Sequence, residues 1–525
     1  MRIYSRELLL RSGCRYGAHL SQEQVADLVA PHPDTLGLVK SWLQYHGVPS
    51  SSFSVTHHGN WLKVTSLNVS QANELLGASY QFYRHTETND TILRTISYAL
   101  PASLESHVKT VAPTTYFGSP RTLTQSLHIP HGDTSVVSEE FGKMPSSRAE
   151  DGLVTPSYLR RLYNLETYVP KAMYQNVLGV AGYNTQFPNH EDLLLFMKEF
   201  RTSATDVDYL VVPVNGDLYI PDIPGVEASL NIQYTQGMAY PTPQVFYSTA
   251  GQAPFIRDSS TPVIPGSDIP VNTNEPFLEW LEFLLSKPYI PPTISTSYSD
   301  NEQTVPEDYA RSVCDSFAEL GTRGVSVLIS SGDFGVGQGD CKVNDNSGKE
   351  QFLPRFPSSC MYDALYTGTG AGRSLHRHAL IGPWVTSVGG TEEYPEVAAS
   401  FSSGGFSNYF QVPYYQDSEV STYIRNLDGL HDGLFKCVRC HDPVLTSLYF
   451  VIRAALRVVG SLTLLRKRAS SRYMWTRSSG SPVVRPARHP CVFSFSDTLL
   501  FVLSIREHTA NCMHTGCGGH NLTAQ

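Results

Sequence analysis

The sequence predicts an α/β fold in which a parallel β-sheet is flanked by helices. Residues 176–183 (NVLGVAGY) are typical of a buried strand, residues 192–200 (DLLLFMKEF) of a helix, and residues 208–216 (DYLVVPVNG) of the next strand. A strand, a helix and a strand at this spacing predict a parallel crossover unit. Residues 325–329 add a β-branched apolar run that suits a strand covered on both faces.

A carboxylate stands where this last run ends. Asp333 lies between Gly332 and Gly335 in a polar, Gly-rich turn. Ligands bind at the carboxyl edge of open α/β sheets, and glycine lets a backbone approach closely because it has no Cβ. Asp333 is therefore a candidate catalytic residue. The same residues also fit a turn in which Asp333 only bonds its own loop.

The first part of the chain predicts a separate small domain. Residues 12–118 alternate short helices and strands, and Ser21 with Gln24 forms the pattern of a capping box at the start of a helix. Residues 119–152 are rich in Ser, Pro, Gly, Thr and His, which is typical of an exposed linker. Further helices are predicted at 35–46 and 70–76, and strands at 53–55, 61–64 and within 91–99.

Composition limits the classes of function. The chain has 525 residues, a net charge of −9, 41% hydrophobic and 17% charged residues, which fits a globular protein of two or three domains. From Lys436 onward there are 12 Lys and Arg against 3 Asp and Glu, so the preceding body is more acidic than the whole. An acidic body argues against a nucleic-acid partner.

Several separated motifs resemble the sedolisin family, the serine-carboxyl peptidases that include fungal tripeptidyl-peptidases. They are SSGDFG at 330–335, ISTSYSDNEQTVPEDYA at 294–310, PWVTSVGGT at 383–391 and FSSGGFSNYF at 401–410. The resemblance covers roughly residues 12–435. It implies a subtilisin-like parallel sheet with flanking helices, preceded by a small α+β prodomain that serves as inhibitor and folding aid.

The resemblance also implies a division of the chain. Residues 1–118 are the predicted prodomain, 119–152 a linker with the activation cleavage region, and 153–435 an incomplete peptidase domain. Residues 361–382 interrupt that domain, either as a translated intron or as a surface loop. Residues 436–525 do not resemble the family and are expected to be poorly ordered, as the product of a frame change or an altered splice.

The predicted acid and base residues come from a helix at 225–238. Glu227 and Asn231 are four residues apart and share one helix face. The resemblance implies that Glu227 is the base, that position 231 carries a helper Asp, and that Asp333 polarises the oxyanion. A carboxylate can activate a Ser hydroxyl at low pH, where His is already charged. Asn231 cannot share an acidic proton, so a weakened enzyme is expected. Without the resemblance, Glu227 fits a solvated helix residue.

The nucleophile is unknown. After residue 435 no segment resembles the Gly-rich segment that carries the nucleophilic Ser in the family. Ser481 lies in the segment with the nearest, but weak, similarity to it. The calcium that the resemblance implies has no recognisable binding loop, and no other metal site is predicted. The pair of cysteines at 437–441 and the histidines at 376–378 lack a partner cluster, and charges at Arg453 and Arg457 argue against a membrane span.

Secretion follows from the family resemblance, although no convincing signal peptide opens the chain. Sequons at Asn68 and Asn89 are candidate glycosylation sites, with a third at Asn521. The expected partners are a peptide or protein substrate and the chain's own prodomain, with no membrane partner and a monomeric state. A disulfide among Cys314, Cys341 and Cys360 is possible, but its pairing stays open.

Two functions follow. The first is a secreted, acid-acting peptidase that releases tripeptides from protein N-termini and is impaired in this chain. Little or no activity is expected of the chain as it stands, because a carboxyl base with no hydroxyl group to activate cannot form an acyl-enzyme. The second is a non-catalytic, peptidase-like protein, or the product of a defective gene model, whose prodomain binds or inhibits peptidases. Peptide release at pH 3–5 separates the two.

Overall fold

The computed structural model describes most of the body of the chain. The described residues are 17–56, 59, 61–65, 67–84, 91–108, 111, 114, 154–170, 176–183, 186–204, 206–222, 224–261, 271–337, 341–345, 347–360, 384–392, 397–413, 416–427 and 433–435. The predictions for the linker at 119–152, the insertion at 361–382, Asn89 and the tail at 436–525 lie outside these residues.

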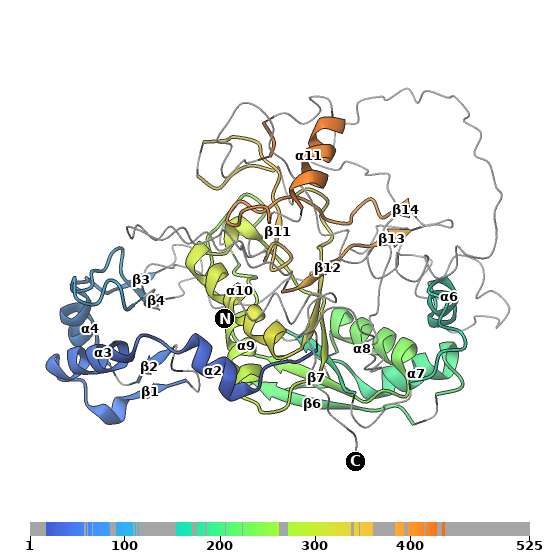
Figure 1. The fold of residues 1–525 in the computed structure, drawn as a ribbon, viewed down its shortest axis with the longest axis horizontal. Helices are drawn as coiled ribbons and strands as arrows, with labels where there is room; N and C mark the ends of the chain where they lie inside the picture. Colours follow the sequence, from blue (N-terminus) through green and yellow to red (C-terminus); the bar gives the residue numbers. More distant parts are fainter. Residues whose placement is uncertain are drawn as a thin grey trace, which may run out of the picture.

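A six-stranded parallel sheet organises the larger part of the described chain, as predicted (Figure 1). Its strand order is β12-β10-β8-β5-β7-β6. The second strand of the predicted crossover, β6, is therefore separated from β5 by β7. The strands span Leu178–Gly182 (β5), Tyr209–Val214 (β6), Gln244–Thr249 (β7), Thr293–Thr296 (β8), Ser326–Ser330 (β10) and Thr386–Val388 (β12).

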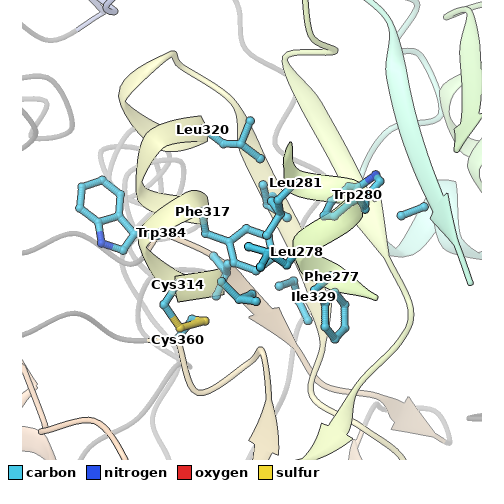
Figure 2. Packing of buried hydrophobic residues seen from close by; sticks show 14 of the residues in the cluster. Phe277, Leu278, Trp280, Leu281, Cys314, Phe317, Leu320, Ile329, Cys360 and Trp384 are labelled. Atoms are coloured by element: carbon cyan, nitrogen blue, oxygen red, sulfur yellow. A yellow bond between two sulfur atoms is a disulfide. The ribbon is translucent and has the colours of Figure 1, made fainter. Parts of the chain in front are cut away.

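Helices cover both faces of this sheet. One face packs against α7 and α8, where Leu193 and Ile232 meet Phe246 of β7 in a buried cluster. The other face packs against α9 and α10 in the largest core of the molecule (Figure 2). The helices span Pro156–Leu162 (α6), His190–Phe200 (α7), Val226–Ala239 (α8), Phe277–Leu285 (α9), Glu307–Thr322 (α10) and Asp417–Asn426 (α11).

The strand β10 departs from its prediction. Val327 and Ile329 are 2% and 1% exposed and enter the core with α9 and α10. Leu328 between them is only half-buried. The strand is therefore fully buried on one face and only partly buried on the other, because neighbouring side chains of a strand point to opposite sides of the sheet.

A disulfide joins Cys314 of α10 to Cys360, whose Cα atoms are 5.3 Å apart (Figure 2). Both cysteines are fully buried beside Phe317 and Phe356. The bond fixes the segment after β11 against α10. Of the three cysteines whose pairing the sequence left open, Cys314 and Cys360 are therefore bonded to each other.

The first part of the chain forms the expected small α+β unit. Ser21 and Gln24 make both hydrogen bonds of the predicted capping box at the start of α2. Asn68 caps α4 in the same manner with Gln71. Leu43 and Leu75 lie in a separate small core. The elements span Gln22–Val29 (α2), Pro33–Tyr45 (α3), Val69–Leu76 (α4), Phe53–Val55 (β1), Leu62–Val64 (β2), Gln81–Arg84 (β3) and Thr91–Arg94 (β4).

Two short antiparallel pairs lie near the carboxyl side of the sheet and position the site. β9 (Asp300–Asn301) follows β8 and pairs with β11 (Arg355–Phe356). β13 (Thr391–Glu392) follows β12 and pairs with β14 (Val397–Ala398). A 3-10 turn at Glu302–Thr304 leads from β9 toward α10.

Candidate active site

Glu227 lies in the first turn of α8 with its side chain almost fully buried, at 3% exposure. Gly225 precedes the helix and packs against the Gln186 side chain. A Cβ at position 225 would lie 1.9 Å from the Gln186 amide oxygen, so only glycine fits at the start of the helix. Asn231, one turn later, donates a hydrogen bond from Nδ2 to Oε1 of Glu227 at 3.3 Å. The predicted pair therefore shares one helix face.

The surroundings of Glu227 make it a weak acid. Burial is the largest cause, and it raises the pKa of Glu227 from 4.5 to about 7. A hydrogen bond from the Ser297 side chain opposes this rise, and the charge of Asp333 adds to it. Glu227 is thus protonated at acid pH and titrates near neutrality, where a group is well placed to take and give protons.

Asp333 reaches the same site from a different element. It follows β10 in a turn where Gly332 has φ +98°, a left-handed conformation that favours glycine. The hydroxyl of Ser403 accepts a hydrogen bond from the Phe334 N–H at 2.9 Å, and the Ser403 N–H donates to the carbonyl of Gly332 at 2.8 Å. The 401–410 motif thus holds the turn, and the charge of Asp333 acts on Glu227.

Ser297 is a site residue that the sequence analysis did not single out. It follows β8 directly, within the motif at 294–310, and its side chain is half-buried. Its hydrogen bond to Glu227 favours the charged form of that carboxyl group. The position of Ser297 at the end of a central strand is a signal that could have identified it from the sequence.

A second pair of carboxyl groups lies close enough to Glu227 for the charge of Glu275 to act on it. Glu275 and Asp300 are 1% and 5% exposed, and the Glu275 N–H donates to Oδ2 of Asp300 at 3.3 Å. Burial, followed by the charge of Glu275, raises the pKa of Asp300 well above its usual range. Two such carboxyl groups share a proton instead of ionising together. Glu275 also raises the pKa of Glu227.

Arg355 is the buried cation of this cluster. Its guanidinium donates to the carbonyl of Ser299 and to Oδ1 of Asn301, each at 2.5 Å. Burial lowers the pKa of Arg355, while Asp300 and then Glu275 and Asp333 raise it. An arginine remains charged in such surroundings.

The stem of Arg355 also touches the turn that carries Asp333. A Cβ at Gly332 would lie 2.9 Å from its Cγ, and the guanidinium lies 5.4 Å from the centre of the Phe334 ring. Arg355 therefore connects the segment after β8 with the turn after β10. No sequence signal other than its place in FLPRFPSSC pointed to it.

Among the residues that the structure describes, no three His, Cys, Asp or Glu side chains come together in a way that would hold a metal ion. The calcium expected from the family therefore finds no ligand set there and enters no step below. The described helices include none that is both long and apolar enough to cross a membrane.

Fold and site together define an α/β protein with an acid–base centre beyond the carboxyl edge of a parallel sheet. A model of the pro-kumamolisin activation domain matches residues 11–117. Tripeptidyl-peptidase SED2 of Arthroderma otae is 36% identical over 427 residues, which are 80% of this chain and 66% of that protein. Tripeptidyl-peptidase SED3 of the same fungus is 33% identical over 80% of this chain and 65% of its own length.

The chain belongs to the sedolisin family. It spans about two thirds of the length of the curated relatives that it matches. Among solved structures, a Pseudomonas sedolisin, a serine-carboxyl proteinase complexed with two molecules of pseudo-iodotyrostatin, matches with a TM-score of 0.33 and 17% identity. That match covers 50% of this chain and 65% of the Pseudomonas chain.

Proposed function

We propose that this protein is a serine-type peptidase, made as a secreted proenzyme, that releases tripeptides from protein N-termini at acid pH. One observation carries the proposal. Glu227, a buried carboxyl group with a pKa of about 7, lies within electrostatic reach of Asp333 beyond the carboxyl edge of the sheet. The relatives named tripeptidyl-peptidase support the substrate class.

In this proposal the ionised form of Glu227, a minor fraction at acid pH because its pKa is about 7, acts as the base that takes the proton of a serine hydroxyl and later returns it to the leaving amine. Asp333, when protonated, donates a hydrogen bond to the oxyanion of the tetrahedral intermediate. Asp333 then sets the alkaline limit of activity, because as the pH rises it loses the proton that it donates. Asn231 orients Glu227 through its amide but carries no proton to share.

The nucleophilic serine of the proposed peptidase is not identified, and a covalent probe can find it. A fluorophosphonate probe forms a bond from phosphorus to the oxygen of an activated serine and releases fluoride. Mass mapping of the labelled chain at pH 5 then identifies that serine. Labelling that is lost in Glu227→Gln but kept in Glu307→Gln supports a peptidase. A chain that takes up no label is the non-catalytic relative, whose prodomain binds or inhibits other peptidases.

Peptide release tests the substrate class. We expect the chain to release tripeptides from a peptide with a free N-terminus at pH 3–5, and to leave the same peptide with an acetylated N-terminus intact. Cleavage of both peptides at internal bonds would replace the tripeptidyl assignment with an endopeptidase.

Asn231→Asp is expected to raise the rate of tripeptide release at pH 4 by about tenfold or more. The new carboxyl group lies one turn from Glu227 and shares a proton with it, which helps Glu227 to accept the proton of the nucleophile. The rate at saturating peptide measures the effect, with Asn231→Ala as the matched control. An unchanged rate in the Asp variant would refute a helper role for position 231.

A further inference from the structure

Glu302 is a fully buried carboxyl group that takes no part in the chemistry proposed for Glu227 and Asp333. It begins the 3-10 turn after β9, and its side chain has 0% exposure. A buried polar group is costly unless it is hydrogen-bonded, so the partners of Glu302 indicate what it does for the fold.

Both carboxyl oxygens of Glu302 bind one loop segment that is distant in the sequence. The Ser407 hydroxyl donates to Oε1 and the Asn408 N–H donates to Oε2, each at 2.5 Å. These partners lie 105 and 106 positions further along the chain. The backbone N–H of Glu302 also donates to the carbonyl of Pro354, at 2.9 Å. Glu302 therefore joins the turn after β9 to the 401–410 motif.

The next residues of the motif are fastened to the same connection. The Tyr409 hydroxyl donates to the carbonyl of Val305 at 2.7 Å, and Arg311 donates from Nη2 to the carbonyl of Tyr409 at 2.8 Å. Val305 follows the 3-10 turn and Arg311 lies in α10. The end of the motif is thus attached to the chain between β9 and α10.

The beginning of the motif holds the turn that carries Asp333. Besides the two contacts of Ser403 with this turn, the Gly335 N–H donates to the carbonyl of Phe401 at 2.9 Å. Ser407 follows Ser403 by only four positions. A displacement of Ser407 therefore moves the residues that hold the turn.

The chain before Glu302 carries the other side of the candidate active site. Ser297, which is hydrogen-bonded to Glu227, precedes Glu302 by five positions. Glu302 thus connects the segment that contacts Glu227 with the motif that holds Asp333.

We propose that Glu302 is a positioning residue that sets the place of Asp333 relative to Glu227, because it fixes the 401–410 motif to the segment after β8. Its hydrogen bonds to Ser407 and Asn408 form this connection. The juxtaposition of the two site carboxyl groups is independent of activity, whereas an effect of Glu302 on rate rests on the proposed peptidase function.

A carbon-13 NMR titration of Glu227 tests this role without an active enzyme. Glu302→Leu fills a similar volume but accepts no hydrogen bond, so the 401–410 motif loses its attachment. The charge of Asp333 raises the pKa of Glu227, so we expect this pKa to fall in Glu302→Leu, by no more than it falls in Asp333→Asn. When Asp333→Asn is already present, Glu302→Leu is expected to cause no further fall.

Two control variants separate positioning from charge and from stability. Glu302→Gln removes the charge but keeps an oxygen for the Asn408 N–H and an amide that can donate to the Ser407 oxygen, so the titration of Glu227 should match that of the parent. Leu320→Ala removes a fully buried side chain near the end of α10, which lowers stability without touching these contacts. It is also expected to leave the titration of Glu227 unchanged.

Peptide release gives a second readout, which depends on the proposed function. In Glu302→Leu we expect kcat to fall about 10²-fold with little change in KM, because a small misplacement of a catalytic group slows the chemical step. Glu302→Gln is expected to keep most of the rate. A parent that releases no peptide would contradict the proposed function alone, since the NMR titration needs no catalysis.

Thermal unfolding of each variant shows whether it is folded. If Glu302→Leu does not fold, Ser407→Ala takes its place, because it removes one of the two donors and is expected to lower the pKa of Glu227 in the same direction. An unchanged pKa of Glu227 in the folded variant would overturn the positioning role. An equal fall in Glu302→Gln or in Leu320→Ala would overturn it as well.

Discussion

Glu227→Gln is expected to abolish peptide release and, above pH 7, to raise the free energy of unfolding by about 3 kcal/mol. Loss of a general base typically costs about 10²–10⁴ in rate. The gain in stability arises because burial raises the pKa of Glu227 from 4.5 to about 7, and this difference corresponds to about 3 kcal/mol. A neutral amide of the same shape avoids the cost of burying a charge.

The pH dependence has a defined sign. Between about pH 4.5 and 7 the folded parent binds a proton at Glu227 that the unfolded chain has lost. The stability of the parent therefore falls through this window as the pH rises, relative to the Gln variant. Below pH 4.5 the carboxyl group is neutral in both states, so the two proteins are expected to be equally stable.

Denaturant unfolding at pH 4 and pH 8 measures this difference. Glu307→Gln is the control, since Glu307 is exposed and pairs only with its neighbour Arg311, a contact that contributes less than about 1 kcal/mol. An equal effect of Glu227→Gln at both pH values would contradict a raised pKa. Because unfolding needs no active enzyme, this result is independent of the nucleophile.

Arg355→Met is expected to destabilise the protein by about 3–5 kcal/mol, because it removes one partner from a buried group of charges. Met keeps much of the apolar stem but leaves the carbonyl of Ser299 and the side chain of Asn301 without their donors. The carboxyl groups of Asp300 and Asp333 also lose their nearby cation. Peptide release is expected to fall with stability, because the turn at Asp333 rests on the Arg355 side chain.

Arg355→Lys separates charge from geometry. Lys restores the charge but has no planar fork to reach two acceptors, so a partial rescue of stability is expected. Arg425→Met is the control, because Arg425 is exposed near the end of α11 and bonds to Thr422, so its effect should stay within about 0.5 kcal/mol. A loss below 1 kcal/mol in Arg355→Met would show that Arg355 does not hold these segments together.

Local patterns predicted the helix face that Glu227 and Asn231 share and the strand end at Asp333, whereas the choice of Glu227 as a site residue came from the family resemblance. Glu227 and Asn231 are one helical turn apart, so their contact follows from helix geometry once the helix is recognised. Asp333 follows a β-branched run, and the carboxyl ends of parallel strands meet at one edge of the sheet. These two predictions depend on residues that are close in the sequence.

The buried network could not be predicted in the same way. Arg355 meets Asn301 through the pairing of two-residue strands that are more than 50 positions apart, and such short strands have no periodicity. Glu275 lies just before α9, and nothing in the sequence around it indicates that its side chain is buried. Its burial with Asp300 depends on how α9 packs on the sheet, which only the fold determines.

The most direct test of the account is the pKa of Glu227 in the parent and in Asp333→Asn. Carbon-13 NMR of Glu side-chain carboxyl groups, with the Glu227 signal assigned from its loss in Glu227→Gln, gives both values. The charge of Asp333 raises the pKa of Glu227, so its removal should lower that pKa, while burial keeps it above 4.5. An identical titration of Glu227 in the two proteins would show that the two carboxyl groups do not form one site.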